Sequence, residues 1–456
     1  MSFQAADLPA SFAHKMQRQL GNAFPDFVNS LSQPAPVSIR LNPWKKNRYT
    51  QLASIPWASQ GRYLAERPVF TLDPFFHAGS YYVQEASSMF LEQALRQCVD
   101  LHKPLHVLDL CAAPGGKSTH MISLLNNESL LVTNEVIRSR AAILAENIQK
   151  WGCHNVAVTN NDPEDFQRLP GFFDVIVVDA PCSGEGLFRK DPEAMREWSD
   201  DNVVLCSRRQ RRILSDIWPS LKENGILVYS TCTYNPEENE ENLAWLKQEH
   251  DVEFLKLRLD PLWGNIVEAE QGGIVGYHFY PHLVQGEGFF ISVIRKNESS
   301  DMMRIKNSKA GFQSPIKKIQ EQVQSWIVDP DALAFIQRDD LVQFLPADKV
   351  AEIELLSKNL RLIMAGTFVA TVKNNKIIPE HALALSTQLN REAFPSLALN
   401  PDDALHYLRR ETLQIPTSHT GFTLMCHEDI PLGWGNVLPN RINNLYPAEW
   451  RIRMSL

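Results

Sequence analysis

The 456-residue sequence has no apolar run near the roughly 18 residues that a membrane-spanning helix needs. Its first residues, Met1 to Asp7, lack the basic and apolar regions of a secretory signal peptide. There is also no internal repeat and no long low-complexity tract. We therefore expect a cytoplasmic, globular protein with no membrane partner.

Cysteine is scarce, and its spacing fits neither a disulfide framework nor a zinc site. The chain has seven cysteines, an odd number, and no two of them form a Cys-x-x-Cys pair. Disulfide-rich domains and structural zinc sites both need paired or closely spaced cysteines. We therefore expect reduced thiols and no metal.

Positive charge is also in short supply, since the formal net charge is −8. Affinity for phosphates comes largely from lysine and arginine, so any site for a nucleic acid must be local. Taken singly, each basic cluster of the chain is more typical of a solvated surface than of a binding site. The clusters are Arg40 with Lys45, Lys46 and Arg48; Arg208 to Arg212; and Arg304 to Lys309 followed by Lys317 and Lys318.

Changes in pattern divide the chain into regions, and its length suggests several domains at roughly 100–200 residues each. Residues 1–75 combine a helix over Pro9 to Leu20 with a strand over Val37 to Leu41. Residues 76–297 alternate strands and helices, and residues 298–330 read as a polar linker that turns basic. Residues 331–456 read as a separate small domain with its own apolar strands, at Leu360 to Met364 and at Phe422 to Met425.

The middle region predicts an α/β fold. Short apolar runs rich in β-branched residues are typical of buried parallel strands, and amphipathic helices separate the first five of them. The expected strands are Leu105 to Leu110, Leu130 to Asn134, Val156 to Thr159, Phe173 to Val178, Ile226 to Ser230 and Phe289 to Ile294.

The ends of the first three strands predict a nucleoside pocket. Small residues and glycines let a ligand approach the backbone at a helix N-terminus, here before a helix over His120 to Leu125. The loop between the first strand and this helix matches neither the Gly-x-Gly-x-x-Gly motif nor a phosphate loop. This loop consists of Cys111, Ala112, Ala113, Pro114, Gly115, Gly116 and Lys117.

Two acids complete the predicted pocket. Glu135 ends the second strand 19 residues after Gly116, close to the spacing of about 20 at which an acid binds ribose hydroxyls. Asp162 follows the third strand, where it could accept a hydrogen bond from an adenine amine. Each acid alone could instead be a turn or helix cap. Together with the glycine loop, they indicate an adenosine pocket.

Two cysteines follow the fourth and fifth strands: Cys182, soon after Asp179, and Cys232. If the first strand is central in a doubly wound sheet, the fourth and fifth strands are neighbours, and these three side chains meet at one edge. A lone buried cysteine is more often inert packing. Two thiols beside a glycine-rich loop suggest covalent chemistry on an electrophilic ring.

The chain contains several longer motifs: Tyr82 to Ser88, Cys111 to Lys117, Asp179 to Gly184, Arg189 to Pro192, Ser230 to Cys232 and Glu287 to Phe290. Together these motifs resemble those of the Nop/Sun family of RNA cytosine-5 methyltransferases. The segments Pro431 to Gly435 and Asn440 to Pro447 resemble the PUA-type RNA-binding module of bacterial members that act on 16S ribosomal RNA.

The resemblance implies a Rossmann-like, S-adenosylmethionine-dependent methyltransferase core, with an α+β RNA-binding domain before it and a PUA-like domain after it. It implies S-adenosyl-L-methionine as methyl donor and a cytosine of 16S ribosomal RNA as acceptor. We expect a monomer whose partner is ribosomal RNA in the 30S subunit. Arg40, Asn42, Arg208 and Arg209 are the expected RNA contacts, although residues 208–212 could simply form a helix face.

The resemblance also implies roles at the thiols. Cys232 would attack carbon-6 of the cytosine, and Cys182 would assist release; from the residues alone, the opposite order remains open. Asp179 would bind the ring edge or lie near the methionine end of the cofactor. Lys190 would hold the ring or lower the pKa of a thiol, unless it only pairs with Asp191. Lys117, at the helix start, would contact the cofactor.

Other functions fit parts of the sequence: methylation of tRNA or another RNA, a non-catalytic RNA-binding assembly factor, or a methyltransferase acting on DNA or a small molecule. Asp179, Cys182 and Cys232 speak against a scaffold, which needs no pair of thiols at strand ends. The C-terminal domain speaks against a small-molecule substrate, which needs no docking module.

Overall fold

The computed structural model describes residues 5–301, 303, 312–374 and 376–454. The basic cluster expected from Arg304 to Lys309 lies outside the described residues. Over the described ranges, no helix is long and apolar enough to cross a membrane.

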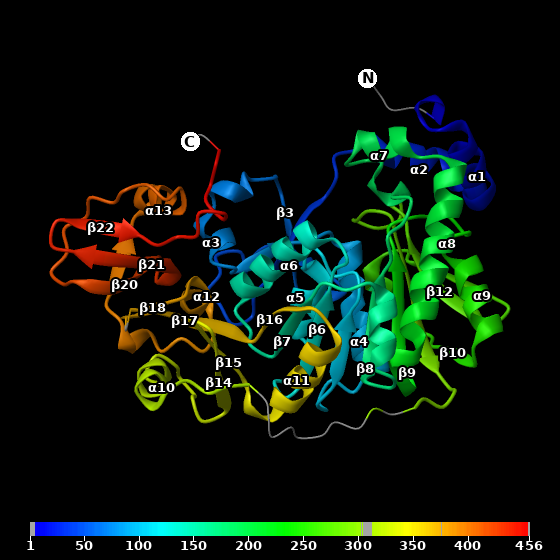
Figure 1. Ribbon diagram of the computed structural model, residues 1–456. Helices are drawn as coiled ribbons and strands as arrows, with labels where there is room; N and C mark the ends of the chain where they lie inside the picture. Colours follow the sequence, from blue (N-terminus) through cyan, green and yellow to red (C-terminus); the bar gives the residue numbers. More distant parts are fainter. Residues whose placement is uncertain (1–4, 302, 304–311, 375, 455–456) are drawn as a thin grey trace.

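A ten-stranded sheet forms the middle of the molecule (Figure 1). Its order is β11-β12-β13-β9-β8-β5-β6-β7-β16, and β10 pairs with β13 outside this path. The strands are β5 (His106–Asp109), β6 (Leu130–Asn134), β7 (Val156–Thr159), β8 (Phe173–Asp179), β9 (Leu221–Thr231), β10 (Val252–Phe254), β11 (Val267–Gln271), β12 (Ile274–Phe279), β13 (Phe289–Lys296) and β16 (Leu362–Ala365).

Five of these strands form the parallel part of the sheet, with β5 central, as predicted. β5 pairs with β6 on one side and with β8 on the other, and β8 pairs with β9. Because these strands are buried on both faces, their apolar runs are nearly continuous. The carboxyl ends of β5, β6, β8 and β9 therefore meet at one edge, where open α/β sheets bind ligands.

The helices of this region form two packed groups. One group contains α4 (Leu91–Cys98), α5 (Gly116–Ile122) and α6 (Arg138–Trp151), and the other contains α8 (Asp200–Ile217) and α9 (Glu240–Glu249). A short helix, α7 (Pro192–Glu197), precedes α8.

The N-terminal unit extends beyond the predicted boundary at residue 75. Its sheet has the order β2-β3-β1-β4, so the chain must reach Val83 to complete it. The helices α1 and α2 lie apart from this sheet, beside α7 and α8 (Figure 1). The elements are α1 (Ala10–Leu20), α2 (Phe24–Leu31), β1 (Val37–Leu41), β2 (Ser54–Ile55), β3 (Ala58–Leu64), α3 (Pro74–His77) and β4 (Tyr81–Val83).

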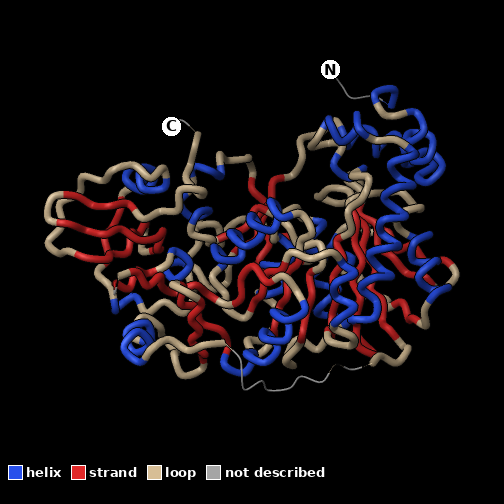
Figure 2. Tube along the Cα trace, in the orientation of Figure 1, coloured by secondary structure: helices blue, strands red, loops and turns tan. Residues whose placement is uncertain are grey.

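The C-terminal region contains two further sheets rather than one. Figure 2 shows the last of them set apart beside the C-terminus. The first consists of β14 (Leu333–Arg338), β15 (Leu341–Pro346), β17 (Thr367–Lys373) and β18 (Lys376–Pro379), and the second of β19 (Ser396–Leu399), β20 (Gly421–His427), β21 (Ile430–Leu438) and β22 (Arg441–Asn444). The helices are α10 (Lys317–Gln324), α11 (Val350–Asn359), α12 (His381–Leu385) and α13 (Pro401–Leu408).

Residues 331–456, predicted as a separate small domain, pack continuously against the rest of the chain. β16 pairs antiparallel with β7 and so extends the central sheet. Leu345, Leu356 and Met364 belong to the same apolar cluster as the parallel strands. The last sheet in turn shares a cluster with the N-terminal sheet, because Tyr407 and Leu432 pack together with Ile39 and other residues of that unit. The three regions are thus joined through continuous apolar cores.

Candidate active site

A cleft of about 830 Å³ opens at the carboxyl ends of β5, β6, β8 and β9. It brings together eight of the predicted site residues, and α8 forms one of its walls. Those eight residues are Cys111, Ala113, Glu135, Asp179, Cys182, Arg208, Arg209 and Cys232.

The glycine loop lies at the β5 end of the cleft and leads into α5, which starts at Gly116, earlier than predicted. Gly115 has a φ of 111°, a conformation that side chains rarely adopt. A Cβ added to Gly116 would lie 3.2 Å from Cε1 of Tyr82, so the N-terminal unit packs directly against this helix start. Arg140 and Asn147 of α6 donate to the carbonyl oxygens of Ala113 and Pro114 and fix the loop.

Glu135 lies in the cleft at the end of β6 and is almost completely buried. One carboxylate oxygen accepts a hydrogen bond from the Ile137 backbone N–H at 2.9 Å, and the other lies 3.3 Å from Arg140. The side chains of Val136 and Ile137 are about half exposed and form an apolar wall of the cleft.

Asp162 is a helix cap, which was the alternative role that its position in the sequence allowed. Its carboxylate caps the short helix Pro163–Arg168 by accepting from the Glu164 backbone N–H at 3.2 Å. Both carboxylate oxygens also accept from Arg212 of α8, at 3.0 and 3.1 Å. Pro163 lines the cleft, so Asp162 stands directly beside it with both oxygens engaged.

The two thiols meet, as the strand pattern predicts. The Sγ atoms of Cys182 and Cys232 are 3.1 Å apart, and the Cys232 backbone N–H points at the Cys182 sulfur from 3.4 Å. The hydrogen bond with Cys232, together with burial, raises the pKa of Cys182 well above its usual range. Cys182 is therefore a protonated thiol whose S–H can face the sulfur of Cys232.

Asp179 stands between the thiols and the glycine loop. Its Oδ2 forms an ion pair with Nζ of Lys117 at 2.7 Å, and its Oδ1 accepts from Oγ of Ser230 at 2.8 Å. Burial alone would lower the pKa of Lys117, but the carboxylates of Asp179 and Asp109 more than offset this and leave it raised. Lys117 is therefore a charged link between loop and strand end.

Asp109 is a residue that sequence reasoning did not single out. It ends β5, is fully buried, and accepts a hydrogen bond from Oγ of Ser118 at 2.6 Å. Burial raises its pKa to about 7. The sequence feature that could have identified Asp109 was its position at the end of the first strand.

Lys190 forms an ion pair and is not among the residues that line the cleft. Its Nζ lies 3.6 Å from Glu287, which also binds Arg189. Asp191 does not pair with it but caps α7 by accepting from the Glu193 backbone N–H at 3.0 Å. Contact between Lys190 and a substrate ring stays a prediction.

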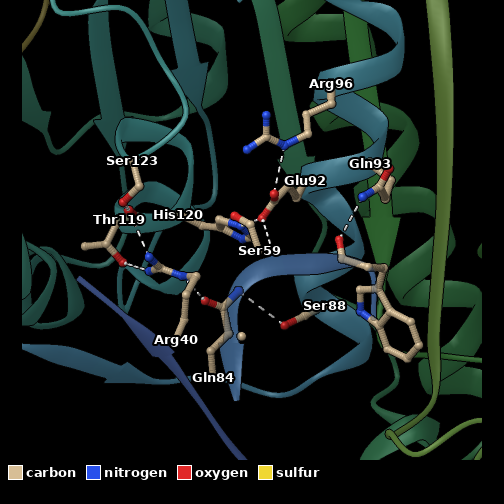
Figure 3. A network of polar contacts seen from close by, with 12 residues as sticks. Arg40, Ser59, Gln84, Ser88, Glu92, Gln93, Arg96, Thr119, His120 and Ser123 are labelled. Atoms are coloured by element: carbon tan, nitrogen blue, oxygen red, sulfur yellow. Dashed lines mark hydrogen bonds and ion pairs between the residues drawn. The ribbon is translucent and has the colours of Figure 1, made fainter. Parts of the chain in front are cut away.

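The prediction that Arg40 and Asn42 contact RNA is wrong, because both side chains are buried. Arg40 lies on β1, between β3 and β4, and its guanidinium donates to Gln84 and Thr119 (Figure 3). It also donates to the carbonyl oxygen of Gly116 in α5. It also stacks on Trp151 at 4.5 Å. Asn42 donates to two backbone carbonyls, one on each side of the contact between the N-terminal unit and α6. Both residues fasten the N-terminal unit to the catalytic region.

The run from Arg208 to Arg212 contributes both to a packed helix face and to the cationic lining of the cleft, which are the two alternatives that the sequence left open. Gln210 and the following apolar residues Ile213 and Leu214 are buried. Arg208, Arg209 and Arg212 line the cleft. One helix thus packs against the sheet and presents a row of cations to the site.

Comparison with protein families gives three matches along the chain. The model of the 16S rRNA methyltransferase RsmB/F matches residues 97–295. The model of the N-terminal domain of 16S rRNA methyltransferase RsmF matches residues 8–86, and that of the RsmF PUA domain matches residues 394–452.

Whole-chain comparisons agree. The chain is 33% identical to ribosomal RNA small subunit methyltransferase F of Escherichia coli O157:H7, over 97% of this chain and 96% of the relative. It is 31% identical to the protein of the same name from Shigella boydii serotype 4, with the same coverage. A solved methyltransferase homologue from Pyrococcus horikoshii has 30% identity and a TM-score of 0.53, over 63% of this chain and 94% of that one. The chain therefore belongs to the ribosomal RNA small subunit methyltransferase F family of RNA methyltransferases.

Proposed function

We propose that the protein methylates carbon-5 of a specific cytosine in 16S ribosomal RNA, with S-adenosyl-L-methionine as donor and a covalent cysteine adduct at carbon-6. The observation that carries this proposal is the pair of thiols 3.1 Å apart, in the same cleft as the glycine loop and Glu135. We propose a monomer that acts on ribosomal RNA in the 30S subunit.

The residues of the cleft fit S-adenosylmethionine. The carboxylate of Glu135 suits ribose hydroxyls, and the apolar side chains of Val136 and Ile137 suit an adenine face. Cys111 and Ala113 of the glycine loop line the same cleft beside them. Asp162 stays in the proposal as the acceptor for the adenine amine, in competition with Arg212. The bound cofactor supplies the methyl group for carbon-5.

Carbon-5 of cytosine is a poor nucleophile, so the ring must be activated. The thiolate of Cys232 adds to carbon-6, and carbon-5 becomes the nucleophilic end of an enamine. Asp179, which lines the cleft beside both thiols, hydrogen-bonds the ring edge and stabilises the adduct.

Release needs two proton movements, and we assign both to Cys182. The Cys182 thiol gives its proton to the departing Cys232 sulfur, and the Cys182 thiolate takes the proton of carbon-5. The electrons of that C–H bond re-form the double bond to carbon-6 as the carbon–sulfur bond breaks. Both cysteines end as thiols, and the proton set free by methylation leaves when Cys232 ionises again.

A cytosine inside a helix cannot reach thiols at the bottom of a cleft, so the target is unpaired or flipped out. Mapping 5-methylcytosine in RNA from cells with and without the gene tests the proposal. We expect a methylated cytosine in 16S ribosomal RNA that disappears without the gene. Loss of methylation only from tRNA, or no loss, would contradict the proposal. Purified 30S subunits and free 16S RNA, methylated side by side, identify the substrate form.

Arg208→Gln combined with Arg209→Gln should weaken RNA binding, because both side chains line the cleft. We expect affinity for 16S RNA to fall about tenfold, and the slope of log affinity against log salt to decrease by about 2, one unit for each lost phosphate contact. Filter binding over a salt series measures both. Arg67→Gln with Arg258→Gln changes the charge equally at exposed positions outside the cleft and should have little effect. Equal effects of the two double variants would remove these arginines from the RNA site.

A further inference from the structure

Three polar side chains lie fully buried behind the loop that carries Cys182. They are Gln210 of α8, Glu238 from the segment after β9, and Asn242 of α9. Asn242 donates to the side-chain oxygen of Gln210 at 2.7 Å, which orients the Gln210 amide. Gln210 in turn donates to Oε2 of Glu238 at 2.8 Å. The result is a fixed chain of hydrogen bonds.

This chain grips the loop on both sides of Cys182. The amide of Gln210 donates to the Pro181 carbonyl oxygen at 3.0 Å. Oε2 of Glu238 accepts from the Ser183 backbone N–H at 3.0 Å. The residues before and after Cys182 are thus each held by one member of the buried pair Gln210–Glu238, and the sulfur between them is aimed at Cys232.

A neutral side chain could hold the loop in the same way at a lower free-energy cost than a buried carboxyl group. Among the described residues, Oε1 of Glu238 has no hydrogen-bond partner although it is buried. Burial raises the pKa of Glu238 to about 7. A glutamine could accept the same two hydrogen bonds without burying a charge. Geometry alone therefore does not explain a carboxyl group at this position, and its charge offers a reason.

The charge acts on Cys182. After the hydrogen bond with Cys232, burial and the charge of Cys232, the negative charge of Glu238 is a further cause that raises the pKa of Cys182. A neighbouring carboxylate keeps a proton on a thiol. The titratable groups that interact with Glu238 are Cys182, Glu185 on the short helix Glu185–Leu187, Cys206 on α8 and Tyr229 on β9.

We propose that Glu238, together with Gln210, is the positioning residue of the release step: it fixes the loop around Cys182 and keeps that thiol protonated against the sulfur of Cys232. This inference rests on the proposed function, because it needs Cys182 to assist release. Glu238 itself acts only through Cys182.

Glu238→Gln tests the inference with an isosteric change. In a reaction with 30S subunits and cofactor, we expect the covalent protein–RNA band on a denaturing gel to accumulate, because release slows about tenfold while adduct formation changes little. The pH dependence of the release rate should also change, since a titrating group has been removed. Glu238→Asp, which keeps the charge, should recover part of the release rate. Glu241→Gln, three residues further along at an exposed position in the first turn of α9, is the matched control.

Thermal melting separates this role from a merely structural one. A carboxyl whose pKa is raised from 4.5 to about 7 on folding favours the folded state below pH 4.5, and this contribution is lost as pH rises through 7. At pH 8, Glu238→Gln should therefore melt no lower than the wild type, although it releases RNA slowly. If Glu238→Gln releases RNA at the wild-type rate while Cys182→Ala accumulates adduct, this inference is overturned but the proposed function is not. Absence of adduct in Cys182→Ala would overturn the proposed function and this inference with it.

Discussion

Cys182→Ala will stop the reaction at a covalent protein–RNA complex, whereas Cys232→Ala will form none. The two sulfur atoms are 3.1 Å apart, but their surroundings differ. The raised pKa of Cys182 keeps it a proton donor. Without that donor, the adduct on Cys232 forms and is methylated, but the carbon–sulfur bond does not break at a useful rate. We expect turnover to fall by roughly 10²–10⁴-fold in Cys182→Ala.

The assay is a denaturing gel after incubation with 30S subunits and cofactor, followed by nuclease digestion and mass analysis of the linked peptide. The peptide should contain Cys232. Cys98→Ala removes a thiol from α4, outside the cleft, and should behave as the wild type. A band from Cys232→Ala but not from Cys182→Ala would reverse the two roles. No band from either variant would argue against a covalent mechanism.

Arg40→Lys will destabilise the protein and weaken cofactor binding without changing its affinity for RNA. The guanidinium donates at once to Gln84 of the N-terminal unit and to Thr119 of α5 (Figure 3), and also to the Gly116 carbonyl oxygen at the start of α5. A lysine has no planar fork to reach both sides, so buried acceptors lose their donors. We expect the free energy of unfolding to fall by about 3 kcal/mol. Because α5 begins at the glycine loop, the same change disturbs the cofactor site.

Calorimetric titration with cofactor, filter binding with 16S RNA, and thermal melting measure the three effects of Arg40→Lys separately. Arg62→Lys, on the neighbouring strand β3, is the control, since two of the three hydrogen bonds of Arg62 are at the surface. Equal cofactor affinity in Arg40→Lys and the wild type would show that Arg40 does not position α5. A selective loss of RNA affinity would restore the RNA contact that the sequence suggested.

The convergence of Cys182, Cys232 and Asp179 could be predicted because it depends on local features. Each residue follows a β-branched run, and a doubly wound sheet then brings the strand ends together. The positions of the glycine loop and of Glu135 at the same edge of the sheet could be predicted in the same way. These predictions needed only strand positions and one rule of topology.

Arg40 and Glu238 could not be predicted, because their roles depend on what packs against them. A basic residue on a short strand looks like a phosphate contact until β1 proves to lie between two strands with α5 against its side chain. Glu238 lies in the acidic run from Glu237 to Glu241, which reads as a solvated surface, yet it is buried against α8. Sequence periodicity does not report contacts between elements this far apart.

The pairing of β16 with β7 also has a consequence for synthesis. An unpaired edge strand is a template for pairing with other chains. β7 ends at Thr159, but its partner spans Leu362–Ala365. During translation, the catalytic sheet therefore keeps one open edge while about 200 further residues are made, long after the residues that carry the chemistry have emerged. The exposed edge is therefore open to pairing with other chains until Leu362–Ala365 have been made and cover it.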